Sequence, residues 1–204
     1  FTEENSIVKD VHGAPYANEL IIPFYQEVKN ANTSILQPQK QKDTVVRRKF
    51  SPYSEWLYFK IYCGSKTAEK ILKETILPFI EKGLEEELFE QFFFIRYRDE
   101  FSHLRIRFYN TNKDKQLVLQ KKFLEAMQPL VDNNIVDKII IDTYTREIER
   151  YSENLIQEAE TLFFNDSLAV LRFINLLDGT DGEKYRLLFA MRGIDMLLND
   201  FKNL

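Results

Sequence analysis

The strongest constraint on the fold is a strand–turn–strand pattern between residues 91 and 109, QFFFIRYRDEFSHLRIRFY. In its second half, apolar residues alternate with polar or charged ones: Leu104, Ile106 and Phe108 against His103, Arg105, Arg107 and Tyr109. Alternation with a period of two is typical of a β-strand with one buried face. Arg105 and Arg107 are therefore expected on the same face of a strand, about 7 Å apart.

Two guanidinium groups held side by side on a rigid strand suit a carboxylate or another anion. The same alternation also fits the solvated outer face of an antiparallel sheet, where arginine is common. The chain carries a net charge of −4 and has a pI near 5.4, so the two arginines do not belong to a basic background. This acidic balance argues against general nucleic-acid binding.

The composition indicates a globular protein with enough apolar material for a core, because 44% of the 204 residues are hydrophobic and 17 are Phe. This length allows one domain, or one domain and a piece of another. No apolar run reaches the length of a membrane span, and no signal-peptide pattern opens the chain.

Cys63 is the one cysteine, which excludes an internal disulfide and fits a reducing cytoplasm. It lies in an apolar strand pattern, so we expect a buried, unreactive thiol. Two histidines and one cysteine are too few for a His/Cys zinc site. We expect no metal and no cofactor.

The order of the elements predicts the fold class. A strand at 56–63, a helix near 67–81, the hairpin, a helix at 114–130 and a strand at 135–144 follow one another. This is the split βαβ or ferredoxin-like arrangement, an α+β fold with a four-stranded antiparallel sheet and helices on one face. Pro78 predicts a kink or an early end of the first helix near Leu77. Four residues of the second helix are expected to point inward: Leu117, Phe123, Leu124 and Met127.

The two ends of the chain are expected to lie outside this unit. Residues 1–49 contain a strand–turn–strand pattern around His12-Gly13 and a polar linker, and they are interpreted as the end of a preceding unit. After residue 150, helices are expected at 153–163, 166–177 and 183–201, with a break at 178–182. These helices are candidates to cover the open face of the sheet.

A second charged motif, TREIERY, follows the last predicted strand. If it is helical, Glu147 and Arg150 lie three residues apart on one side. A local surface ion pair worth a few tenths of a kcal/mol, ~0.2–0.5, explains this spacing equally well.

Several motifs together resemble the C-terminal elimination domain of lantibiotic dehydratases of the nisin type, a domain that also occurs in thiopeptide biosynthesis proteins. They are, in order, SPYSEWLY at 51–58, FFFIRYRD, HLRIRF, YTREIERY and LFFNDS at 162–167. Residues 13–23 are similar to the end of the preceding glutamylation domain of that family. The resemblance implies that 1–49 is the tail of that domain with a linker, and that 50–204 is an elimination domain that is incomplete at its C-terminal end.

In the family, Ser and Thr residues of a ribosomally made precursor peptide are glutamylated with glutamyl-tRNA by the companion domain. The C-terminal domain then eliminates glutamate and leaves dehydroalanine or dehydrobutyrine. The resemblance thus implies a lyase-type dehydratase in bacteriocin biosynthesis, with the glutamylated precursor peptide as its partner. A cytoplasmic location is expected, and both homodimerisation and a peripheral place in a membrane-bound modification complex stay open.

The resemblance also assigns candidate site residues. The arginines of the family's H-L-R-x-R strand fall on Arg105 and Arg107, and the Glu and Arg of its R-E-x-E-R-Y motif fall on Glu147 and Arg150. These four are the candidate catalytic residues, and four others are candidates for substrate binding: His103, Arg96, Tyr109 and Tyr151.

The family has an essential histidine in a later segment, whereas this sequence has only His12 and His103 and ends at Leu204. We therefore expect a chain truncated at both ends, with incomplete catalytic machinery. Two other functions stay open: an enzyme of the same fold that forms the pyridine ring of thiopeptides, and a non-catalytic module that holds a precursor peptide.

Overall fold

The computed structural model describes residues 46–177 and 181–202, so the turn predicted around His12 lies outside the described residues. The described elements follow one another as β1 (Lys49–Phe50), β2 (Trp56–Tyr62), α1 (Ser65–Ile71), the π-helical turn η2 (Leu72–Ile76), α2 (Leu77–Glu85), β3 (Gln91–Arg98), β4 (Ser102–Tyr109), α3 (Lys113–Asp132), β5 (Lys138–Asp142), β6 (Tyr144–Thr145), α4 (Ile148–Tyr151), α5 (Ile156–Asn175) and α6 (Asp181–Lys202).

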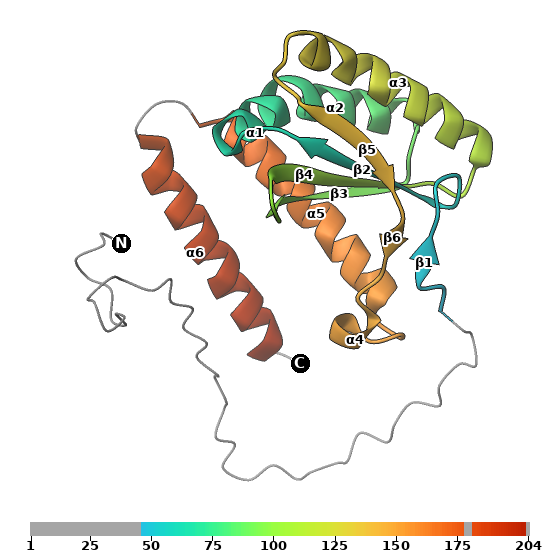
Figure 1. Cartoon of the computed structure of the whole chain (residues 1–204). Helices are drawn as coiled ribbons and strands as arrows, with labels where there is room; N and C mark the ends of the chain where they lie inside the picture. The colour runs from blue at the N-terminus through green and yellow to red at the C-terminus, as the bar shows by residue number, and fades with distance from the viewer. Residues whose placement is uncertain (1–45, 178–180, 203–204) are drawn as a thin grey trace, which may run out of the picture. The chain divides into compact units, whose positions relative to one another are not determined.

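Four strands form an antiparallel sheet in the order β3-β4-β2-β5, with α-helices packed on it (Figure 1). The predicted α+β class is confirmed. The strand expected at 135–144 is divided, however, because Asp142 Oδ1 accepts a hydrogen bond from the Thr143 N–H at 2.7 Å and turns the chain. Tyr144 then pairs with Phe50 in a separate two-stranded ribbon, β1-β6.

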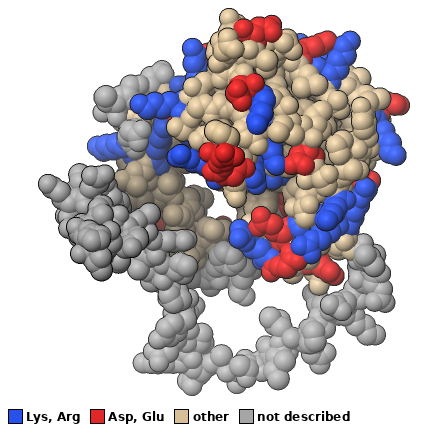
Figure 2. Space-filling model, viewed as in Figure 1, with Lys and Arg blue, Asp and Glu red and all other residues tan. Residues whose placement is uncertain are grey.

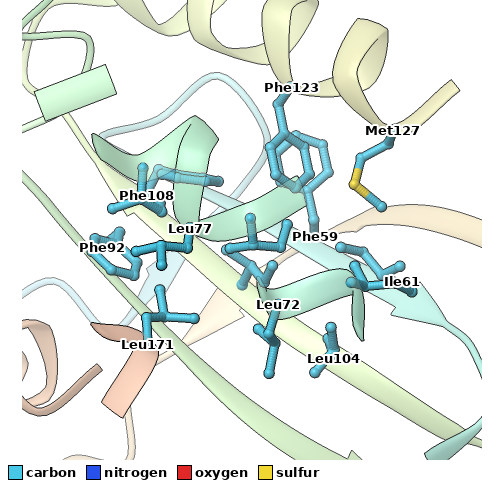
Figure 3. Close-up of a cluster of buried hydrophobic side chains, with 14 of the residues drawn as sticks. Phe59, Ile61, Leu72, Leu77, Phe92, Leu104, Phe108, Phe123, Met127 and Leu171 are labelled. Atoms are coloured by element: carbon cyan, nitrogen blue, oxygen red, sulfur yellow. The ribbon is translucent and has the colours of Figure 1, made fainter. Parts of the chain in front are cut away.

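The main hydrophobic core lies between the sheet and the helices of one face, as the alternation predicts (Figure 3). Phe59 of β2, Phe108 of β4 and Phe123 of α3 meet at its centre, with ring centroids 4.5–6.3 Å apart. The inward position of Leu117 is wrong, because its side chain is 51% exposed and Leu119 is buried instead. The buried stripe of this helix contains Gln116, Leu119, Phe123 and Met127, so Phe123 and Met127 point inward as predicted and Leu117 alone lies outside the stripe.

Pro78 does not end the first helix. The chain stays helical from Ser65 to Glu85, and Pro78 lies in the first turn of α2, directly after the π-helical turn. In the π-helical turn the Leu77 N–H donates to the Leu72 carbonyl, and this local shift of the hydrogen-bond pattern accommodates a proline that has no N–H to donate.

The two helices predicted at 153–163 and 166–177 are one continuous helix, α5. The polar residues expected to cap a second helix bond elsewhere: Asn165 Nδ2 donates to the Thr161 carbonyl at 3.0 Å, and Ser167 Oγ accepts from the Phe94 N–H at 3.1 Å. Ser167 thereby pairs one backbone N–H on the free edge of β3, so α5 shields the first half of this edge strand, while residues 95–98 stay exposed.

The expectation that the later helices cover the open face is only partly met. Helix α5 lies along β3, with Phe164 against Phe92 of the main core and Phe163 against Phe93 on the other face. Farther along that open face, Ile95, Tyr97 and Ile140 are exposed. Within the described ranges, no helix is both long enough and apolar enough to cross a membrane.

Candidate functional site

A pocket of about 250 Å³ opens where the open face of the sheet meets α4 and α5. Three of the four candidate catalytic residues line it, namely Arg107, Glu147 and Arg150. The remaining lining residues are Phe93, Phe94, Ile95, Tyr144, Thr145, Tyr151, Ile156, Phe163, Asp166 and Ser167. Pockets for drug-sized ligands hold about 300–1,000 Å³, so this one suits a group of amino-acid size.

Arg107 lies in the wall of this pocket inside a cage of aromatic rings. Its Cζ is 4.4 Å from the ring centre of Tyr58 and 4.9 Å from those of Phe93 and Tyr144. The strand register produces this cage, because Tyr58 and Phe93 are the cross-strand partners of Arg107 on β2 and β3. Rings around a guanidinium contribute cation–π attraction, which is larger where water is excluded.

The charge of Arg107 is incompletely satisfied within the protein. The residue is 7% exposed, and its Nε and Nη1 atoms have no hydrogen-bond partner among the described residues. Burial lowers the pKa of its guanidinium, and the nearby Tyr58 and Tyr144 hydroxyls act in the opposite direction. Buried donors are nearly always hydrogen-bonded, so two unpaired guanidinium nitrogens beside a pocket indicate a place for an acceptor from outside the chain.

The ribbon β1-β6 positions the segment that contains the other two charged candidates at the pocket, Glu147 and Arg150. Tyr144 stacks on Phe50 at 5.9 Å, and the short helix α4 begins directly after the ribbon. Glu147 stands at the N-terminus of α4, and its Oε2 lies 3.2 Å from Arg150 Nη1. This is the local ion pair that the spacing predicts, and both side chains remain more than half exposed.

Arg105 shares the sheet face with Arg107 but does not line the pocket, so the candidate residues Arg105, Arg107 and Arg150 do not all lie in one cleft. Its guanidinium lies over the ring of Tyr97 at 3.5 Å, and its Nε donates to His103 Nε2 at 3.0 Å. The cause is local: Tyr97 is the cross-strand partner of His103, so its ring reaches over the neighbouring arginine.

His103 is buried, and both of its ring nitrogens are engaged. Nε2 accepts from Arg105, while Nδ1 lies 3.0 Å from the Phe101 carbonyl and the ring stacks on Tyr62 at 4.7 Å. An arginine Nε is always a donor, so the neutral ring carries its proton on Nδ1. His103 therefore positions Arg105 rather than presenting a free nitrogen, and direct substrate contact by its ring is not supported.

The other candidate binding residues separate. Tyr151 lines the pocket and packs on Phe163 at 5.2 Å. Tyr109 lies on the same sheet face but packs on Trp56 and is absent from the pocket wall. Arg96 is paired across the sheet with Leu104, so it faces the helices and bonds to the Ser65 carbonyl; its assignment to this site is wrong.

Nine residues that line the pocket were not among the predicted site residues, and four of them are discussed here: Phe93, Tyr144, Asp166 and Ser167. Phe93 is paired with Arg107 across the sheet, so both side chains point to the same face. The alternation of residues along the two strands could therefore have identified Phe93. Asp166 and Ser167 belong to the motif LFFNDS, which the sequence singled out without a role. Tyr144 is the first residue of the motif YTREIERY, but its place beside Arg107 depends on the β1-β6 ribbon.

Charge elsewhere on the described surface is mixed. Figure 2 shows acidic and basic side chains side by side, without a large area of one sign. A larger cavity of about 650 Å³ lies between α2 and α3, lined among others by Phe79, Lys82 and Leu130. It contains none of the predicted site residues.

Comparison with known families decides the family. Residues 56–204, more than half of the chain, match the family described as the C-terminal part of lantibiotic biosynthesis dehydratases. The chain belongs to this family. The predicted resemblance is thereby confirmed, and the residues around Arg107, Glu147 and Arg150 lie within the matched range.

Two curated lantibiotic proteins are similar to this family member. It is 28% identical over 162 residues to the subtilin biosynthesis protein SpaB of Bacillus subtilis, covering 79% of this chain and 16% of SpaB. It is 28% identical over 185 residues to the nisin biosynthesis protein NisB of Lactococcus lactis subsp. lactis, covering 90% of this chain and 18% of NisB. The chain therefore spans less than a fifth of the length of these relatives.

Two solved structures share the fold of this lantibiotic dehydratase domain. The tRNA-dependent lantibiotic dehydratase MibB from Microbispora sp. 107891 matches with a TM-score of 0.56 and 24% identity, covering 67% of this chain and 14% of MibB. TsrL matches with a TM-score of 0.50 and 16% identity, covering 66% of this chain and 39% of TsrL. Both likenesses concern the fold alone.

Proposed function

We propose that this domain eliminates glutamate from glutamylated Ser and Thr residues of a ribosomal precursor peptide. The observation that carries the proposal is the buried Arg107 guanidinium, with two unpaired nitrogens, Nε and Nη1, beside a pocket of amino-acid size. A glutamyl carboxylate would supply the missing acceptor, because guanidinium and carboxylate groups pair with matched geometry. Membership of the dehydratase family supports the same reaction.

The chemistry explains why fixed cations are needed. A base takes the α-proton of the modified residue, the Cβ–O bond breaks, and glutamate leaves as a carboxylate while a Cα=Cβ bond forms. Negative charge develops on the backbone carbonyl and on the departing carboxyl group. Guanidinium groups that are already in place stabilise such charge without reorganisation.

Arg107 and Arg150 are the proposed donors at the pocket, and Glu147 orients Arg150 through their ion pair. Arg105, held by His103 and Tyr97, is proposed as a second cation for the peptide on the same face. Tyr151 is proposed to contact the peptide from α4, and Tyr109 to support that face through Trp56.

We also propose that the sheet is of the ferredoxin-like, split βαβ type, which the strand order β3-β4-β2-β5 supports. Residues 50–204 would then form the elimination domain, and 1–49 the tail of a glutamylation domain with its linker. Glutamyl-tRNA would be the substrate of that companion domain rather than of this one.

The test is a single-turnover assay of the protein encoded by the full open reading frame, with a synthetic peptide that carries one O-glutamyl serine as substrate. Arg107→Ala and Arg150→Ala should each slow glutamate release about 100- to 1,000-fold, since one preorganised donor is lost. Arg107→Lys should restore little, because a point charge cannot make two-pronged carboxylate contacts. Mass spectrometry follows the conversion of the glutamylated peptide to the dehydrated one.

Arg172→Ala is the matched control, because Arg172 is an exposed arginine on α5 with its nearest carboxylate, Glu81, at 4.0 Å. It should release glutamate at the parental rate. If Arg107→Ala releases glutamate at the parental rate, Arg107 has only a structural role and the proposal is wrong. Tight binding of the peptide without any turnover would favour the non-catalytic binding module.

A further inference from the structure

An ion pair beside the pocket is almost completely buried. Arg146 Nε and Nη2 bond to the two carboxylate oxygens of Glu160 at 2.7 and 2.6 Å. The two side chains are only 5% and 3% exposed. Neither residue lines the pocket, and the proposed function gives neither of them a role.

The pair joins three segments of the chain that are distant in sequence. The Arg146 N–H and Nη1 donate to the Arg48 and Arg47 carbonyls at 2.9 and 3.1 Å, which fixes β1 against β6. Glu160 lies on α5 and also accepts from the Tyr144 hydroxyl at 2.9 Å. One carboxylate therefore links the ribbon β1-β6 to α5.

Two of the linked segments, the one around β6 and helix α5, carry part of the pocket wall. Tyr144 places its ring 4.9 Å from the Arg107 guanidinium. Glu147 directly follows Arg146 in sequence, and α5 carries Phe163 and Asp166. A displacement of the pair would therefore move the β6 side and the α5 side of the pocket relative to each other.

Stability alone does not require this pair. Burying two charges costs desolvation energy, and well-packed apolar residues often replace buried ion pairs without loss of stability. What an apolar pair cannot supply is direction, because the two-pronged contact fixes the relative orientation of the partners. We propose that Arg146 and Glu160 are positioning residues that align Tyr144, Glu147 and α5 around Arg107; this rests on the proposed glutamate elimination.

The experiment compares Arg146→Met/Glu160→Leu with the parent, again in the full open reading frame with the O-glutamyl peptide. The apolar double variant leaves the Tyr144 hydroxyl without its acceptor, so its melting temperature should fall slightly. Its kcat should fall about 100-fold, as expected for a small misplacement of reacting groups. Glu160→Gln leaves a buried guanidinium partly unpaired, so it should lower both kcat and the melting temperature. KM should change less than kcat in both variants.

Two further variants make the test specific. Tyr144→Phe keeps the ring on Arg107 and removes only the link to Glu160, so kcat should fall several-fold at an unchanged melting temperature. Glu55→Gln is the control, because it breaks an exposed ion pair with Arg47, on the same ribbon side, at 2.6 Å. It should leave kcat unchanged.

The outcomes separate this inference from the proposed function. A double variant, or a Tyr144→Phe variant, with parental kcat overturns the positioning role. If the parent releases no glutamate, the proposed elimination fails, and Trp56 fluorescence decides the positioning role instead. Trp56 is the one tryptophan of this sequence and lies 5.3 Å from Tyr144. Its emission, isolated by subtracting the spectrum of a Trp56→Phe variant, should shift in the double variant and not in Glu55→Gln. Unchanged emission in the double variant then overturns the proposal.

Discussion

At the scale of single residues, two helical glycines stand in opposite surroundings. A Cβ at Gly83 of α2 would lie 2.5 Å from Phe89 Cε1, whereas a Cβ at Gly193 of α6 would meet nothing within 4 Å. Phe89 has little room to move, because its ring packs on Phe92 and Phe108. Helix propensity favours alanine at both positions, and packing opposes it only at Gly83.

We expect Gly83→Ala to lower the free energy of unfolding by about 1–3 kcal/mol, the usual range for overpacking a core. Gly193→Ala should raise it by up to about 1 kcal/mol, because the exposed helix gains propensity without a clash. Urea unfolding of both variants measures the two effects. If Gly83→Ala instead raises the free energy of unfolding, the Phe89 ring moves aside at little cost, and the expected clash is wrong.

At the scale of elements, β5 is an edge strand tied to β2 by a charged contact. Asp142 Oδ2 lies 2.5 Å from Lys60 Nζ, with both groups on the face that carries Arg105. Burial acts to raise the pKa of Asp142, but hydrogen bonds from Lys60 and the Thr143 N–H outweigh it and hold this pKa below its usual range. The bond to Asp142 raises the pKa of Lys60.

The lowered pKa of Asp142 fixes the direction of a pH effect. Its contribution to stability is present above the unfolded pKa of about 3.9 and is lost as the pH falls through the folded value. Asp142→Asn should therefore lower stability at pH 7, by no more than about 1 kcal/mol for a partly exposed pair. The difference from the parent should vanish in acid below both pKa values.

Thermal melting of the parent and Asp142→Asn between pH 7 and strong acid checks this expectation. Glu125→Gln on α3 is the control, because it breaks an exposed pair with Lys121 at 3.8 Å. A difference for Asp142→Asn that grows in acid would contradict the assigned sign.

At the scale of the whole molecule, the strand order divides the sheet into protected and exposed parts. The two central strands, β2 and β4, have partners on both sides, and β3 is covered by α5. Strand β5 pairs only with β2. Hydrogen-exchange protection follows such differences in local opening.

Native-state hydrogen exchange should therefore find the slowest amides in β2 and β4, among them those of Phe59 and Ile106. Outward-facing amides of β5 should exchange fastest within the sheet. Slow exchange throughout β5 with fast exchange in β4 would contradict the strand order and, with it, the ferredoxin-like arrangement that we propose.

The sequence alone determined the local and periodic features of this protein. Alternation along β2 and β4 predicted which face each residue takes, because successive strand side chains must point to opposite sides. It placed Arg105 and Arg107 together, and spacing predicted the Glu147–Arg150 pair. The motifs predicted the family, because several of them occur in the order that is typical of it.

Only the tertiary structure decided which of these residues share the pocket. Arg107 and Arg105 have the same parity, yet one enters an aromatic cage and the other stacks on Tyr97, because their cross-strand neighbours differ. Tyr144 and Asp166 reach the pocket through the β1-β6 ribbon and the edge-covering helix α5. Such contacts join residues that are distant in sequence, so no local pattern can contain them.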